Sequence, residues 1–192
     1  MSREEWRPGV VTVIDLIGVT RQAESGQGST LMRQMHAFVR ARFDNALPRH
    51  SHAYLWNDSV LLLAFLNDDL GEKEAIVREA HDLKAQLDAD LGLPSYGIVV
   101  QGEMFPEDPI ASAVFNGQIA AGQRTTIIKA SSYAMANCFI IEEHLGGHKQ
   151  SWYIDSRVAK DLATAKRAKK AKVTLLPLNK EREIWMYSGP LW

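Results

Sequence analysis

Short β-branched stretches and longer amphipathic stretches alternate along the 192-residue chain. Apolar runs bounded by Gly, Pro, Asn or Asp predict strands, and apolar residues spaced three and four apart predict helices. We therefore expect strands near 10–14, 52–56, 59–66, 96–105, 125–129, 152–154, 173–178 and 183–187. Helices are expected near 31–47, 71–91, 110–121, 131–145, and from Asp155 through the basic run at 166–172.

The order of these elements begins strand, helix, two strands, helix, strand. It predicts an α+β fold in which helices pack on one face of a mainly antiparallel sheet. Ser29 or Thr30 is expected to cap the first helix, and Asn57-Asp58 to form the turn between two strands. The sequence shows no internal repeat, linker or low-complexity segment, so we expect a single domain over residues 1–192.

Composition narrows the functional classes. The net charge of −1 gives no case for a nucleic-acid or membrane-surface partner. A single cysteine, Cys138, excludes an internal disulfide and indicates a reducing compartment. The first residues are polar and lack a signal-peptide core, and the longest apolar run, 59–66, is too short to span a bilayer. We therefore expect a soluble, cytoplasmic protein.

Two acids interrupt the apolar pattern. Asp15 ends the first strand, where it could simply cap the following turn, and Asp58 lies 43 residues later at the turn between two strands. In this topology the two acids are neighbours, and paired carboxylates repel one another unless divalent cations hold them. Oxygen ligands suit Mg²⁺ or Mn²⁺, and Gly18 lets backbone N–H groups approach a polyphosphate. The pattern predicts a two-metal nucleotide site.

The motifs around these acids resemble those of class III nucleotide cyclases. DLIGVT at 15–20 is similar to the family's D-I-x-G-F-T signature, and WNDSVLLLAF at 56–65 is similar to its Gly-Asp hairpin, with Asn57 replacing glycine. YGIVVQGE at 96–103 and LNKEREIWMY at 178–187 resemble the family's fourth strand and closing hairpin. The resemblance implies a ferredoxin-like cyclase core that binds a nucleoside triphosphate and two Mg²⁺ or Mn²⁺ ions. It also implies a homodimer with shared active sites.

The resemblance assigns roles to individual residues. Asp15, Asp58 and the backbone carbonyl of Leu16 would hold the two metals. Gly18, Val19 and Thr20 would cradle the phosphates. Lys180 would pair with the triphosphate, although it could also be a solvated turn lysine.

Tyr54 is the most informative departure from the purine cyclases. It lies four residues before Asp58, where those enzymes carry a lysine or glutamate that reads the base. Tyrosine there is typical of the short, stand-alone pyrimidine cyclases of bacterial Pycsar anti-phage systems. The resemblance implies UTP or CTP as substrate, with UTP favoured, although Tyr54 could be an ordinary strand aromatic.

The family's helix asparagine and arginine have no direct counterpart here. The best register places Tyr133 and Asn137 at those positions and Thr126 where purine enzymes read the base. Asn137 is then the candidate catalytic residue of this helix, whereas a one-residue shift would place Ala134 and Cys138 there. The missing arginine keeps a second hypothesis open, a degenerate cyclase-like module that binds nucleotide or only dimerises. A third is another metal-dependent nucleotidyl transferase on a similar fold.

Overall fold

A computed structural model describes residues 7–19, 24, 26–67, 69, 71–104, 132–146, 149–163, 167–176 and 178–192. The helix expected at 110–121 and the strand expected at 125–129 lie outside these residues, as do Thr20 and Thr126. No helix in the described ranges is long and apolar enough to cross a membrane.

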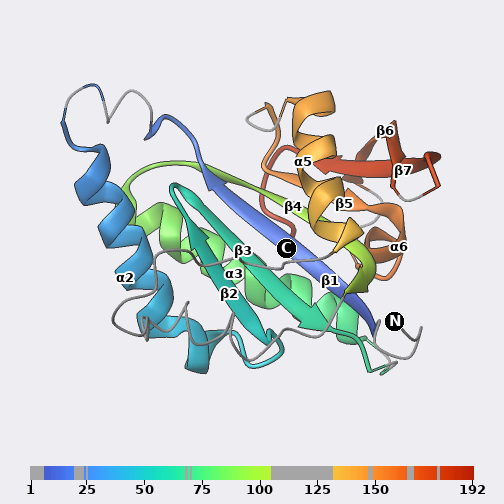
Figure 1. The fold of residues 1–192 in the computed structure, drawn as a ribbon, viewed down its shortest axis with the longest axis horizontal. Helices are drawn as coiled ribbons and strands as arrows, with labels where there is room; N and C mark the ends of the chain where they lie inside the picture. The colour runs from blue at the N-terminus through green and yellow to red at the C-terminus, as the bar shows by residue number, and fades with distance from the viewer. Residues whose placement is uncertain are drawn as a thin grey trace, which may run out of the picture.

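A seven-stranded sheet forms the centre of the molecule (Figure 1). Its strands are β1 (Arg7–Leu16), β2 (His52–Trp56), β3 (Ser59–Phe65), β4 (Ser95–Met104), β5 (Trp152–Asp155), β6 (Lys169–Leu175) and β7 (Lys180–Tyr187). They lie in the spatial order β2-β3-β1-β4-β5-β7-β6. Every neighbouring pair is antiparallel except β4 and β5, which are parallel. The predicted α+β fold with a mainly antiparallel sheet is confirmed.

Helices cover both faces of this sheet, so the expectation of one covered face was wrong (Figure 1). In β1, Val10 and Ile14 pack on one side with α2 (Gly28–Ala46) and α3 (Glu72–Leu91). Val11 and Val13 point to the opposite side, where α5 (Tyr133–Leu145) packs. A strand that is apolar on both faces needs two covering layers, and the valines and isoleucine of β1, interrupted only by Thr12, pack against both.

Helices α5 and α2 begin differently, since α5 has a side-chain cap and α2 has none. Ser132 caps α5, close to the start of the helix expected at 131–145, and its hydroxyl accepts hydrogen bonds from the N–H groups of Ala134 and Met135. Helix α2 instead begins at Gly28, one turn or less before the predicted caps, and Gln27 precedes it without a side-chain cap. Ser29 and Thr30 therefore lie inside the helix.

The basic run near the C-terminus is a strand, which corrects the prediction of a helix there. Asp155 does cap a helix, but this helix, α6 (Ser156–Ala159), has only four residues. Farther along the chain, Lys169–Leu175 forms β6, in which Val173 and Leu175 are buried and Thr174 between them is exposed. Lysine and alanine favour helices, yet the apolar residues alternate and β7 supplies a ladder of backbone hydrogen bonds.

Candidate active site

Asp15 lies near the end of the central strand β1, between two hydroxyl groups from its neighbours. Its direct cross-strand partners are Ser59 on β3 and Tyr96 on β4. Paired residues of adjacent strands point to the same face, so both hydroxyls reach the carboxylate. The Ser59 hydroxyl donates to Oδ1 of Asp15, and the Tyr96 hydroxyl lies 2.9 Å from Oδ2. The register of three strands thus fixes one acid.

Asp58 is tied to the same end of β1 through the backbone. The N–H of Leu16 donates to the Asp58 carbonyl oxygen over 3.1 Å, which holds the β2–β3 turn against β1. Asn57 adopts a left-handed conformation with φ of +51° in this turn, as the predicted hairpin requires. The expected convergence of the two acids is found, since both line one pocket.

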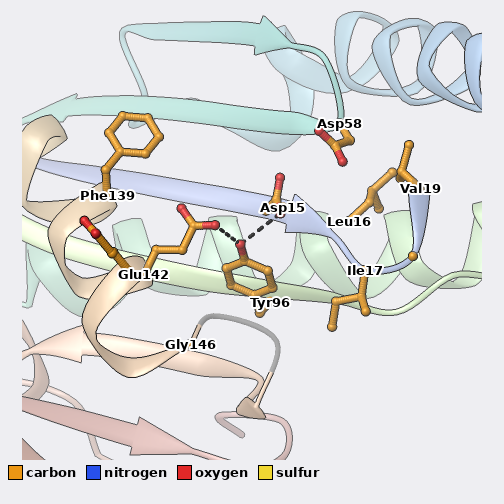
Figure 2. A pocket seen from close by; sticks show the side chains of 11 residues that line it. Asp15, Leu16, Ile17, Val19, Asp58, Tyr96, Phe139, Glu142 and Gly146 are labelled. Carbon is orange, nitrogen blue, oxygen red and sulfur yellow. Dashed lines mark hydrogen bonds between the residues drawn. The ribbon is translucent and has the colours of Figure 1, made fainter. Parts of the chain in front are cut away.

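That pocket has a volume of about 650 Å³ (Figure 2). Its walls come from the end of β1 and the turn after it, from the β2–β3 turn, from Tyr96, and from α5. The residues that line it are Asp15, Leu16, Ile17, Gly18, Val19, Asp58, Tyr96, Phe139, Glu142, Glu143 and Gly146. Of the residues predicted to bind metal or phosphate, it gathers Asp15, Leu16, Gly18, Val19 and Asp58.

Negative charge dominates the pocket. Four of its lining residues are carboxylic acids, and none of the described lining residues is a lysine, arginine or histidine. Burial, together with the neighbouring charges of Asp58 and Glu142, raises the pKa of Asp15 to about 6. Hydrogen bonds from Ser59 and Tyr96 partly oppose this rise. Burial and the adjacent acids also raise the pKa of the Tyr96 hydroxyl, so it stays protonated.

The donor set fits a hard divalent cation. Carboxylate and carbonyl oxygens are the ligands that Mg²⁺ and Mn²⁺ prefer, and each oxygen of Asp15 keeps a lone pair after accepting one hydroxyl hydrogen. No group of three or more His, Cys, Asp or Glu side chains among the described residues could hold an ion by itself. Magnesium commonly takes only one or two protein carboxylates and completes its shell with water and substrate phosphates. The site suits ions that arrive with a polyphosphate.

The turn after β1 positions the backbone that was expected to cradle phosphate. Gly18 has φ of +91°, a left-handed conformation that favours glycine, and a side chain at this position would meet open space. The N–H of Ile17 is not available to a ligand, because it donates to the Pro94 carbonyl oxygen over 2.8 Å. Of the residues predicted to cradle the phosphates, Gly18 and Val19 line the pocket, and Thr20 lies outside the described residues.

Tyr54 and Lys180 lie outside the described pocket wall. Tyr54 is buried on β2, opposite Leu61, which in turn lies opposite Val13 on β1. It therefore shares the sheet face of Asp15 but lies two strands away. Lys180 is exposed at the start of β7. The structure does not bring either residue to the acids of its own chain.

Asn137 has a structural contact that sequence reasoning missed. Its side chain is buried on α5, its amide nitrogen donates to the Leu176 carbonyl oxygen, and its amide oxygen accepts from the Leu176 N–H. These two bonds, of 3.1 and 2.9 Å, fasten α5 to the end of β6. Asn137 is not among the residues that line the pocket, and Tyr133, its proposed partner, is also absent from this wall.

Tyr96 and Glu142 line the pocket, yet the sequence pattern did not single them out. Tyr96 opens β4 in a run that reads as an ordinary strand, and Glu142 lies beside the apolar stripe of α5. The signal that would have identified Tyr96 is the strand register, because Asp15 on the central strand lies directly opposite one residue on each neighbouring strand. That register is not known before the fold.

Neither a protein-family model nor a curated protein matches the sequence. Solved structures do match. The catalytic core of a rhodopsin-guanylyl cyclase with converted specificity, in complex with ATPαS, is 10% identical, with a TM-score of 0.65 over 96% of this chain and 97% of that one. The adenylyl cyclase CyaB from P. aeruginosa is 8% identical, with a TM-score of 0.59 and coverage of 94% and 93%.

A bacterial light-regulated adenylyl cyclase is 9% identical, with a TM-score of 0.62 over 94% of this chain. This chain spans about half of that protein, 51% of its length. The similarities establish that the chain has the fold of adenylyl and guanylyl cyclase domains.

Proposed function

We propose that this protein is a nucleotidyl cyclase that converts UTP, or CTP, into the 3′,5′-cyclic nucleotide and pyrophosphate. The observation that carries the proposal is the convergence of Asp15 and Asp58 in one pocket of a cyclase fold. Two oxygen-ligand acids at the end of a central strand suit metal-assisted attack on a phosphate. We further propose that it acts in the cytoplasm and that its product is a second messenger in anti-phage defence.

The charge of the pocket supports a metal requirement. A nucleoside triphosphate is itself strongly negative, and it would enter a wall bearing four carboxylates. Such a ligand binds only if cations neutralise both partners. Two divalent ions supply this charge when bound, and they also activate the ribose 3′-oxygen and stabilise charge on the attacked phosphate.

The chain's own residues then have separate tasks. Asp15, Asp58 and the Leu16 carbonyl would hold the ions, and the two hydroxyls on Asp15 keep its carboxylate oriented before substrate arrives. The turn at Gly18 and Val19 would place backbone N–H groups beside the phosphates.

The positions of Tyr54 and Lys180 favour a site completed by a second copy of the chain. Both lie away from the acids of their own chain, and the half-buried Leu61, Leu63 and Phe65 occupy the same sheet face near Tyr54. Apolar side chains that are only partly buried on a sheet face suit an interface. We propose a homodimer in which one copy supplies the acids and the other supplies Tyr54 and Lys180.

Tyr54 supports pyrimidine selectivity within this dimer. Its ring would shorten the base pocket, and its hydroxyl would bond either uracil O4 or cytosine N4. Rejection of purines would follow from the lost space. Thr126, which falls at a base-reading position of purine enzymes, lies outside the described residues and is proposed only by the resemblance.

Incubation with each of the four ribonucleotide triphosphates and Mn²⁺, followed by mass spectrometry of the products, tests this function. We expect cyclic UMP or cyclic CMP, a large loss with Tyr54→Ala, and a smaller loss with Tyr54→Phe, which keeps the ring. A preference for ATP or GTP, or an unchanged rate in Tyr54→Ala, would contradict the pyrimidine assignment.

A second candidate function is a degenerate cyclase-like module that binds nucleotide without turning it over. The engagement of Asn137 with the Leu176 backbone favours it, because that side chain is buried and already bonds the end of β6. No described residue of the pocket wall supplies the missing arginine. The same assay separates the candidates, since this module would bind a triphosphate and release no cyclic product.

Mixing inactive variants tests whether the site is shared between two chains. Asp15→Ala and Tyr54→Ala should each be inactive alone, and a mixture should recover part of the activity. In a mixed dimer one of the two composite sites is intact. Absence of recovery after demonstrated subunit exchange would place both functions in one chain.

A further inference from the structure

A chain of hydrogen bonds links helix α5 to the first acid of the pocket (Figure 2). The Tyr96 hydroxyl lies 2.9 Å from Oδ2 of Asp15 and 2.5 Å from Oε1 of Glu142. Tyr96 comes from β4, Asp15 from β1 and Glu142 from the last turns of α5. One phenol oxygen therefore bridges a strand acid and a helix acid. Its single hydrogen serves one of these contacts, and the other is a hydrogen bond when a carboxyl proton is donated to the phenol oxygen.

This contact is not needed to dock the helix. Ala134, Cys138 and Ile141 of α5 are completely buried against the sheet and already supply the apolar packing. Placing Glu142 beside Asp15 brings two like charges together, which is unfavourable in the protein without cations. An arrangement that packing does not require and that charge opposes indicates a role at the site.

We propose that Tyr96 and Glu142 are positioning residues for Asp15, so that helix α5 sets the orientation of the carboxylate that receives a divalent cation. Ser59 fixes one carboxylate oxygen, and the Glu142–Tyr96 pair fixes the other. A carboxylate side chain that is held in place before the cation arrives binds it more tightly than a freely rotating one, because less side-chain freedom is lost on binding. This inference rests on the proposed metal site of the cyclase.

The experiment measures Mn²⁺ affinity of the full chain by calorimetry and electron paramagnetic resonance, without nucleotide. Tyr96→Phe keeps the ring and removes the link, so we expect a loss of about tenfold in Mn²⁺ affinity. Glu142→Ala should lose a similar factor. The double variant should be no weaker than either single one, because both changes break the same chain of hydrogen bonds.

Conservative variants separate positioning from charge. Glu142→Gln can still bond the Tyr96 hydroxyl, so it should retain most of the affinity that Glu142→Ala loses. Glu143→Gln is the matched control, since Glu143 lines the same pocket and carries the same charge, whereas the Tyr96 contact is made by its neighbour. Both glutamine variants remove one carboxylate from the pocket, so we expect them to lose similar factors in affinity, each smaller than the loss in Glu142→Ala.

Several results would overturn the positioning role. These are an unchanged affinity in Tyr96→Phe, equal losses in Glu142→Ala and Glu142→Gln, additive losses in the double variant, or no Mn²⁺ binding by the wild type at millimolar concentration. Thermal unfolding of each variant guards against a folding defect, and Glu142→Gln retains the packing if Glu142→Ala does not fold. The product assay is independent of these affinities. If the variants show the expected Mn²⁺ affinities but the wild type forms no cyclic nucleotide, the proposed reaction is wrong and the positioning role still holds.

Discussion

Asp15 and Asp155 are both acids at the ends of strands, and the protein treats them in opposite ways. Asp155 is fully buried, and it accepts hydrogen bonds from the Arg157 N–H, the Arg157 guanidinium and the Arg182 guanidinium. Asp15 receives two neutral hydroxyls and faces further acids. No positive side chain in the described part of its pocket balances it.

The difference separates an acid that serves the fold from one that serves a ligand. Asp155 is neutralised by its own chain, so its charge is satisfied once the protein folds. Asp15 is oriented by its chain but not neutralised, so a cation from solution would complete its surroundings. The contrast can be tested at both acids.

The largest expected effect is on catalysis. Asp15→Asn should reduce cyclisation on the order of a thousandfold, equivalent to about 4 kcal/mol, because it removes a charged metal ligand. The variant should fold normally, since asparagine keeps the size, its amide oxygen can accept the Ser59 hydroxyl, and its amide N–H can donate to the Tyr96 hydroxyl oxygen. Product formation and thermal unfolding measure the two effects. Full activity in a folded Asp15→Asn protein would contradict the proposal that Asp15 binds a catalytic metal ion.

Asp155→Asn should show the reverse pattern, with a loss of stability. We expect the free energy of unfolding to fall by about 3 kcal/mol, since the arginines lose their buried counter-charge. Urea denaturation measures this change. Asp161→Asn is the control: its side chain is 49% exposed and pairs with Lys73, so its loss should cost less than about 0.5 kcal/mol. Similar losses at both positions would contradict a special role for Asp155.

The pH dependence of stability should reveal Asp15. Its pKa is about 6 in the folded protein against 3.8 for an unperturbed aspartate, so the folded chain keeps a proton that the unfolded chain loses. Raising the pH from about 4 to above 6 should therefore lower the free energy of unfolding by about 2 kcal/mol through this group. Denaturation of the wild type and of Asp15→Asn at several pH values measures it.

The difference between those two proteins isolates Asp15, because the other acids are common to both. Burial also acts on Glu79, but hydrogen bonds from His50 and Arg49 outweigh it and lower the pKa of Glu79. That residue therefore stabilises the folded state at pH values above its unfolded-state pKa, which is the opposite of Asp15. A wild-type minus variant difference that does not change with pH would be evidence against a proton held at Asp15.

Ser59→Ala should have the smallest effect. Loss of its hydrogen bond to Asp15 should lower the free energy of unfolding by about 1 kcal/mol above pH 6. The pKa of Asp15 should also rise, because the Ser59 hydroxyl stabilises the charged form. The midpoint of the pH-dependent difference should move upward, whereas an unchanged midpoint would mean that the hydroxyl does not act on the carboxylate.

Local chemistry was enough to predict much of the molecule. The apolar spacing in Glu72–Leu91 and the turn at Asn57 are determined by nearby residues, and the structure has both. Asp15 was identifiable because a carboxylate in a valine-rich strand conflicts with burial. Asp58 followed from its place in a hairpin turn.

The remaining features depend on how distant strands align. The contacts of Tyr96 with Asp15 and Glu142 join residues 81 and 46 positions apart, and no local pattern contains them. The pair of bonds from Asn137 to Leu176 likewise appears only when α5 meets β6. The basic run was misassigned for the same reason, since its pairing with β7 outweighs its helix propensity.

The register of β1 also has a consequence for folding kinetics. Asp15 meets Ser59 across a separation of 44 residues and Tyr96 across 81, so the pocket cannot exist until three strands have aligned. A slip of one residue in the pairing of β1 would turn Asp15 toward the helices α2 and α3, so the pocket would lack this carboxylate. Contacts of such long range form slowly, and local helices form before them. The capacity to capture a divalent ion would therefore appear late in refolding, as a reporter of correct alignment.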